Sequence, residues 1–304
     1  MTIERCWVCG ADDLVERWTG SGRGAGTATE SGVDPAAFLP SADQFGRTVS
    51  AVISCRACGH GVVSELPRHD AVANAYLEAA DPVSLREEAG QIETARRALA
   101  RIERWARPGR LLEVGSWTGS FLVAALERGW KAEGIEPSQW AVARARERGL
   151  EITDKELDDV DLDDHAFDAI VACDVLEHLA DPGAALERFR HALAPTGVLF
   201  VTVPDAGSRL AKVLGRRWWS VLPMHLQYFT RESITIALRE HGFDVVEIRS
   251  HPKLFTVRYY AERFTSFVPG LGSIAARATG RSRFADRLVA PDFHDRMAVI
   301  AKAR

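Results

Sequence analysis

The stretch RLLEVGSWTGSF at residues 110–121 decides the fold of this 304-residue chain. A short hydrophobic run ends at Gly115, and a loop that contains Gly119 leads into an apolar segment with helical spacing. Glycines at a strand-to-helix turn let backbone amides approach a ligand closely, and the N-terminus of the helix adds a favourable dipole. The stretch therefore predicts a strand, a ligand-binding loop and a helix.

Strand and helix patterns continue to alternate from this stretch to about residue 250, which is typical of βαβ units. We expect an α/β fold with a mainly parallel, Rossmann-like sheet, and MAVIAKA at residues 297–303 as an antiparallel last strand at the edge of that sheet. Composition shifts divide the chain into a cysteine module (1–66), a helical linker or lid (67–108) and a catalytic domain (109–304) with a helical insertion at about 251–292.

Two acidic residues flank the glycine loop. Glu136 ends the second strand, 21 residues after Gly115, where a carboxylate can accept hydrogen bonds from two ribose hydroxyls. Glu113 precedes the loop and suits a ligand with a positive amino group better than one with a pyrophosphate. The glycine pattern of dinucleotide-binding sites is missing, which makes a nicotinamide cofactor the weaker interpretation.

These motifs, together with FDAIVACDVLEHLADP at residues 167–182 and RWWSVLPMHLQYFT at residues 217–230, resemble the class I S-adenosylmethionine methyltransferases. The chain is most similar to the bacterial zinc-ribbon branch, which includes sugar-nucleotide C-methyltransferases and enzymes of secondary metabolism. The resemblance implies sites for methionine (Glu113, Gly115, Ser116 and Gly119), ribose (Glu136), adenine (around Asp154 to Leu157) and the region near the sulfonium (Asp174). Trp117 stands where the family usually has glycine.

Four of the five cysteines form two CxxCG turns, Cys6 with Cys9 and Cys55 with Cys58, which are 45 residues apart. Each turn can present two thiolates to one tetrahedral ion, so the pattern predicts a structural zinc site. Buried thiols or a redox pair are the alternatives, but a redox CxxC usually occurs once, beside a βαβ unit.

Polar residues after the predicted fourth strand and in the later PMHLQYF segment are candidates for the chemistry. Asp174, Glu177 and His178 follow this strand, and His225 lies in the later segment. In similar sugar methyltransferases that later segment usually reads glutamate-histidine. Histidine can accept a proton near neutral pH, so we expect His225 to act as a general base, with help from His178. Met224 replaces the glutamate, which favours methylation of a hydroxyl over carbon methylation of a keto-sugar.

Other roles remain open for these residues. Asp174, Glu177, His178 and His225 resemble the set that holds a divalent cation in small-RNA 2′-hydroxyl methyltransferases, so a Mg²⁺-assisted reaction is an alternative. Each histidine could instead be structural, and Tyr76 is a weaker candidate on the substrate side. A binding or scaffold protein that keeps the fold without turnover is the alternative from another class.

Composition limits the partners. The net charge is −4 and lysines and arginines form no basic stripe, which disfavours nucleic acid. The N-terminus lacks the pattern of a signal peptide and no apolar run reaches the length of a membrane span, so we expect a cytoplasmic enzyme. A small-molecule acceptor, such as a sugar or glycosylated metabolite, fits these limits, and a homodimer is compatible with them.

Overall fold

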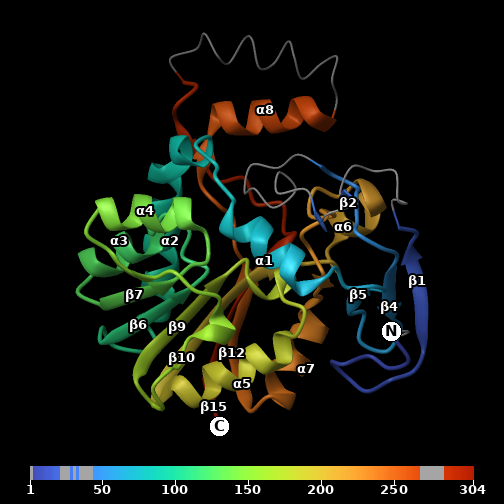
Figure 1. The fold of residues 1–304 in the computed structure, drawn as a ribbon, viewed down its shortest axis with the longest axis horizontal. Coiled ribbons are helices and arrows are strands. Elements are labelled where there is room, and N and C mark those ends of the chain that lie inside the picture. The colour runs from blue at the N-terminus through green and yellow to red at the C-terminus, as the bar shows by residue number, and fades with distance from the viewer. Residues whose placement is uncertain (1–2, 21–27, 30–31, 34–43, 268–283) are drawn as a thin grey trace.

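The computed structural model describes residues 3–20, 28–29, 32–33, 44–267 and 284–304. A seven-stranded sheet forms its centre, in the order β12-β15-β10-β9-β6-β7-β8 (Figure 1). Its strands are β6 (Arg110–Val114), β7 (Lys131–Ile135), β8 (Glu151–Thr153), β9 (Phe167–Cys173), β10 (Leu193–Pro204), β12 (Phe243–Ser250) and β15 (Arg296–Ala303). Five neighbouring strands, β8 to β10 in this order, run parallel, and the prediction of a mainly parallel Rossmann-like sheet is confirmed.

The last strand differs from its expected place. Strand β15 is antiparallel to its neighbours, as predicted, but it pairs with both β10 and β12 and so lies inside the sheet. Its central residues from Met297 to Ala301 are all buried, which explains why the run is almost wholly apolar. The more polar β12 forms the edge instead.

Helices cover both faces of the sheet. One face packs against α5 (Pro182–Ala192) and α7 (Arg231–Glu240), and the other packs against α2 (Glu88–Ile102), α3 (Ser120–Glu127) and α4 (Gln139–Glu147). Alternate residues of one strand serve the two cores: Leu112 and Val114 of β6 face the first, and Leu111 faces the second. This is the period of two expected for a strand buried on both sides.

The cysteine module adds a smaller antiparallel sheet in the order β1-β4-β5-β11. Its strands are β1 (Leu14–Trp18), β4 (Val52–Cys55), β5 (Gly61–Val63) and β11 (Gln227–Tyr228), and a separate short hairpin joins β2 (Ala28–Thr29) to β3 (Gly32–Val33). Strand β11 comes from the later part of the chain and begins two residues after His225. The module is therefore joined to the catalytic part of the molecule by a shared sheet.

The remaining elements lie toward the C-terminal ends of the parallel strands. Helix α1 (His69–Leu77) and a 3-10 turn (Ser84–Glu87) precede α2, so the expected helical linker is broken between residues 78 and 83. Helix α8 (Val257–Phe267) lies above the sheet and belongs to the expected insertion, of which residues 268–283 are outside the described range (Figure 1). Within the described ranges, the other α-helix is α6 (Arg209–Leu214), and the other two strands are β13 (Phe255–Thr256) and β14 (Leu288–Val289). No helix among the described residues is long and apolar enough to span a bilayer.

Candidate active site

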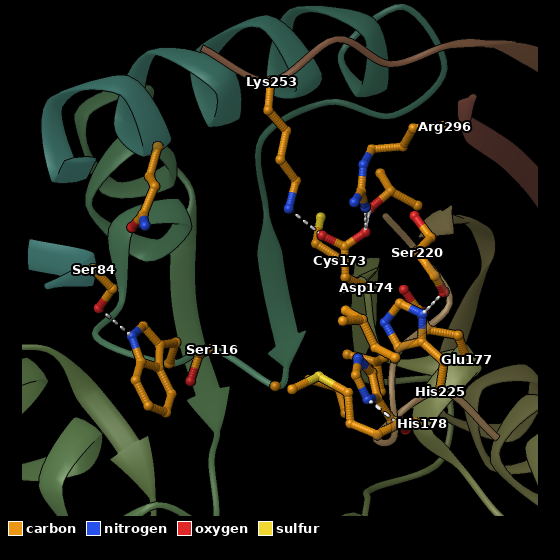
Figure 2. Close-up of a pocket in the computed structure, with 18 of the residues that line it drawn as sticks. Ser84, Ser116, Cys173, Asp174, Glu177, His178, Ser220, His225, Lys253 and Arg296 are labelled. Carbon is orange, nitrogen blue, oxygen red and sulfur yellow. Dashed lines mark hydrogen bonds and ion pairs between the residues drawn. The ribbon is translucent and has the colours of Figure 1, made fainter. Parts of the chain in front are cut away.

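A cavity of about 1000 Å³ opens at the C-terminal ends of the central strands. It lies beside β6 and β9, where the strand order reverses direction, and this is the usual ligand crevice of an open α/β sheet. Its wall contains most of the residues that the sequence selected: Tyr76, Glu113, Gly115, Ser116, Glu136, Asp174, Glu177, His178 and His225. The protein fold thus brings the two predicted sets of site residues into one space (Figure 2).

The loop after β6 forms one end of the cavity, which we call the cofactor end. Gly115 has a φ of 70°, and the backbone amides of Gly115 and Ser116 both donate to the carbonyl of Ile135. A side chain at Gly115 would meet Val175 at 2.7 Å. Glycine is needed here because of both its backbone conformation and this close approach.

Glu136 lies beside this loop with only 5% of its surface exposed. Its carboxylate accepts the amide of Trp117 at 2.8 Å and that of Ser138 at 2.9 Å, which fixes it at the end of β7. Burial raises the pKa of Glu136 to about 7. Each oxygen keeps a further lone pair, so the geometry suits the acceptance of hydroxyl protons from a ribose.

Glu113 is also buried, and its Oε2 has no hydrogen-bond partner within the described part of the chain. Burial, and then the nearby charge of Glu136, raises its pKa well above the usual value. A buried carboxylate with an unpaired oxygen is costly, and a bound cationic group would offset that cost. The residues at this end therefore fit a ligand with a ribose and a positive amino group.

Trp117, where the resemblance led us to expect glycine, adopts a φ of 46°. This left-handed conformation favours glycine. The indole Nε1 donates to Ser84 Oγ at 3.1 Å and so joins the loop to the turn before α2. The tryptophan thus covers the cofactor end from the linker side.

At the other end of the cavity, which we call the acceptor end, two histidines and a carboxylate converge. One ligand atom from each of Glu177, His178 and His225 lies within 4.8 Å of the others. The backbone fixes both rings, because Nδ1 of His178 lies 3.1 Å from the carbonyl of Met224 and Nδ1 of His225 lies 2.7 Å from the carbonyl of Ser220. A carbonyl only accepts, so each Nδ1 carries the proton and each Nε2 keeps a lone pair.

Burial keeps both histidines neutral. It lowers the pKa of His225 to about 4, and burial, together with the repulsion that a second positive ring would meet beside His225, lowers the pKa of His178 well below its usual value. Tyr76 from α1 lies against the pair, with its hydroxyl 3.0 Å from His178 Nδ1. Both carboxylate oxygens of Glu177 are buried without a hydrogen-bond partner among the described residues, and burial raises its pKa to about 8.

Asp174 lies between the two ends and also has a positive φ, of 57°. It forms ion pairs with Lys253 and Arg296, two cavity residues that the sequence analysis did not select (Figure 2). Lys253 follows the edge strand β12, and Arg296 begins β15. Their positions at strand ends are the only sequence signal for these two residues. The sequence analysis missed that signal because it expected β15 at the edge of the sheet.

Two predicted cofactor residues lie elsewhere. Asp154 is exposed, pairs with Arg146 at 3.0 Å and does not line the cavity, but Glu156 and Leu157 of the same predicted adenine stretch do, together with Asp158. Gly119 caps α3 with a φ of 79°, and a side chain there would meet Leu150 at 2.3 Å. Gly119 therefore lets the loop pack closely against Leu150 and does not line the cavity.

The four cysteines of the module cluster as the spacing predicts. Their sulfur atoms lie within 4.8 Å of one another, with Cys6 and Cys58 at 3.7 Å and Cys9 and Cys55 at 3.6 Å. A tetrahedral zinc with bonds of about 2.3 Å would separate its sulfur ligands by about 3.8 Å, so these residues fit a zinc ion. The module contacts the acceptor end through β11, where Trp7 and His60 both hydrogen-bond the side chain of Gln227.

Comparison with known proteins identifies the class. The family described as "Methyltransferase domain" matches residues 86–248, more than half of the chain, and the chain belongs to this family. It is an S-adenosylmethionine-dependent methyltransferase of the class I fold, as predicted, with a four-cysteine cluster that is compatible with a zinc ribbon.

Individual relatives are more distant. A ubiquinone biosynthesis O-methyltransferase of Alkalilimnicola ehrlichii is 32% identical over 120 residues, which are 36% of this chain and 48% of that protein. An uncharacterized 37.1 kDa protein in transposon TN4556 of Streptomyces fradiae is 36% identical over 109 residues, 33% of this chain and 32% of that protein. The chain thus spans half or less of the length of the curated relatives that it matches.

Among solved structures, the complex between the Haloferax volcanii Trm112 methyltransferase activator and the putative methyltransferase shares the fold. It has a TM-score of 0.51 and 18% identity, and the match covers 71% of this chain and 90% of that chain.

Proposed function

We propose that this methyltransferase methylates a hydroxyl oxygen of a small molecule, such as a sugar, glycoconjugate or secondary metabolite, and that His225 is the general base. The observation that carries the proposal is the state of His225, which is buried, neutral and fixed by Ser220 so that Nε2 can accept a proton. The O-methyltransferase relative supports oxygen as the acceptor atom.

Bound S-adenosylmethionine supplies a methyl group on a sulfonium, which is a good leaving group. The chain's own residues then have two tasks. Glu113 and Glu136 bind the cofactor by charge and hydrogen bonds, and Gly115 lets the loop approach the cofactor closely. His225 takes the hydroxyl proton as the new carbon-oxygen bond forms and the carbon-sulfur bond breaks, and His178 orients the site beside it.

Met224 favours oxygen over carbon as the acceptor. It is buried in the cavity wall next to His225, where it carries no charge. Carbon methylation of a keto-sugar needs an enolate, which is formed more readily when a second acid or base assists. Keto-sugar methylation is therefore the alternative that we rank lower.

The test is His225→Ala, with turnover measured as formation of S-adenosylhomocysteine over a panel of phenols, sugars and glycosides. We expect the rate to fall by about 10² to 10⁴, the usual contribution of a general base, while affinity for S-adenosylhomocysteine in calorimetry stays unchanged. His191→Ala, an exposed histidine on α5, is the matched control. A fully active His225→Ala enzyme would show that His225 is not the base and has only a structural role.

A second candidate is metal assistance. Glu177, His178 and His225 form a carboxylate-histidine-histidine set, and the bonds from both Nδ1 atoms to carbonyls are the usual support of metal-binding imidazoles. A divalent cation held there would acidify an acceptor hydroxyl. Loss of activity with a chelator, recovery with Mg²⁺ or Mn²⁺, and loss of that recovery in Glu177→Gln would favour this mechanism over His225 as base.

We also propose that the cysteine cluster binds one structural zinc ion. Four thiolates complete a tetrahedral site and leave no open position for a substrate, so this ion has no place in the reaction.

A further inference from the structure

Two cations at the acceptor end pair with a single carboxylate. Lys253 and Arg296 both line the cavity, and within the described ranges the carboxylate of Asp174 is the ion-pair partner of each. Two half-buried cations thus share one anion. A lone cation in a site of low dielectric is costly, so such an imbalance needs another anion or a ligand that supplies one.

The other acidic groups near these cations form no ion pair with them in the described part of the chain. The thiol of Cys173 is adjacent, but burial holds its pKa at about 12, so it is neutral at physiological pH. Asp295, beside Arg296 in sequence, accepts a hydrogen bond from Trp218 Nε1 at 2.8 Å, and Asp292 accepts from Ser250 and the amide of His294. Glu177 makes no ion pair with either cation in the described part of the chain.

The two cations are held in place by their backbones. The hydroxyl of Tyr260 in α8 donates to the carbonyl of Lys253 at 2.9 Å, and the amide of His251 donates to the carbonyl of Arg296 at 3.1 Å. In Figure 2 the Lys253 side chain extends toward Asp174, and Ser116 lies on the opposite side of the cavity from His225. Both cations thus meet Asp174, which lies on the His225 side of the cavity, where an acceptor molecule would sit.

From this arrangement we propose that Lys253 and Arg296 bind an anionic group of the methyl acceptor, a carboxylate or a phosphate, and so align its hydroxyl with His225. The inference rests on the proposed function and narrows its acceptor to an acid. Arginine can bind such a group with two parallel hydrogen bonds, and lysine adds a mobile point charge. The aromatic side chains of Trp219, Tyr259 and Tyr260 in the same wall suit an aromatic or sugar body for that acceptor.

The experiment uses the full chain loaded with S-adenosylhomocysteine and compares 4-hydroxyphenylacetate with 4-hydroxyphenylacetamide in calorimetry. The two probes differ in charge and share the ring and hydroxyl. We expect the acid to bind at least tenfold more tightly than the amide, and a competition arm with inorganic phosphate to show whether phosphate binds to the same cations as the carboxylate.

Variants assign the effect to residues. Lys253→Met should remove most of the preference for the acid, and Lys253→Arg, which keeps the charge, should retain it. Lys131→Met, at an exposed position on β7, is the matched control and should change nothing. In all four proteins the affinity for S-adenosylhomocysteine should stay within about twofold, which also shows that each variant folds.

Several outcomes would overturn the inference. Equal binding of acid and amide, or no binding of either the acid or phosphate, would show that the cations serve only Asp174. A parallel fall in S-adenosylhomocysteine affinity in Lys253→Met would assign the lysine to the cofactor instead. Failure of the wild-type protein to bind S-adenosylhomocysteine would contradict the proposed function itself, which keeps the two failures apart.

Discussion

The two ends of the cavity differ in how the chain builds them. The cofactor end comes from residues 113–138, one continuous strand-loop-helix-strand segment whose side chains meet because the segment folds locally. The acceptor end draws Tyr76, His178, His225, Lys253 and Arg296 from five segments spread over 220 residues. A local motif reveals the first end in the sequence, and only tertiary contacts create the second.

The two ends also differ in charge. Buried carboxylates dominate the cofactor end, where burial raises the pKa of Glu136 to about 7. Neutral histidines and two cations dominate the acceptor end. A cationic methyl donor and an anionic acceptor would therefore each meet the opposite charge, with Asp174 between them. The predictions below separate the two ends experimentally.

Loss of the zinc site should have the largest effect and should damage the acceptor end first. Cys58→Ser removes one of four ligands, and β5 of the module pairs with β11 just after His225. We expect zinc, measured by mass spectrometry at about one per chain in the wild type, to fall to near zero, with loss of soluble protein, because metal binding supplies folding energy. Cys173→Ser, outside the cluster, should keep its zinc. Normal stability of a metal-free Cys58→Ser protein would contradict a structural role.

A change at Glu136 should affect the cofactor end alone. Glu136→Ala removes the buried carboxylate that we expect to accept two ribose hydroxyls. Each charged hydrogen bond contributes about 1.5 to 3 kcal/mol, so affinity for S-adenosylhomocysteine should fall at least tenfold. Calorimetry checks this, with Glu133→Ala in the same strand as the control. Tight binding of NADH in place of S-adenosylhomocysteine would contradict the assignment of the cofactor.

Tyr76→Phe should have a smaller effect, confined to the acceptor end. The substitution removes the hydroxyl near His178 Nδ1, yet the carbonyl of Met224 still holds that ring. One hydrogen bond contributes about 0.5 to 1.5 kcal/mol, so we expect kcat to fall about twofold to tenfold with unchanged cofactor affinity. A loss as large as that of His225→Ala would mean that Tyr76 touches the substrate.

The pH profile should show the smallest change. Because burial lowers the pKa of His225 to about 4, the base stays neutral above pH 5, and it is lost only as the pH falls through 4. We expect kcat at saturating cofactor to vary less than about twofold between pH 6 and 9, without the limb near 6.5 of an exposed histidine. Metal assistance predicts the opposite, since Glu177, with a pKa of about 8, must lose its proton to bind a cation and activity would then rise toward pH 8.

The sequence by itself determined the features that depend on neighbours along the chain. Gly115 and Glu136 follow apolar strands at a fixed spacing, and the two CxxCG turns each end in a glycine of positive φ, Gly10 and Gly59. Such patterns can be recognised in the sequence because a few neighbouring residues determine the turn that presents the ligand atoms. The fold class and the class of enzyme follow from them.

Only the tertiary structure decided the rest. It placed β15 inside the sheet, moved Asp154 to the surface, and brought Lys253 and Arg296 to one carboxylate. A lysine after a strand has the same local sequence whether it faces solvent or a cavity, and the order of strands in a sheet depends on packing between distant segments. The cofactor could therefore be inferred from the sequence, whereas the charge offered to the acceptor emerged only when β12 and β15 came together.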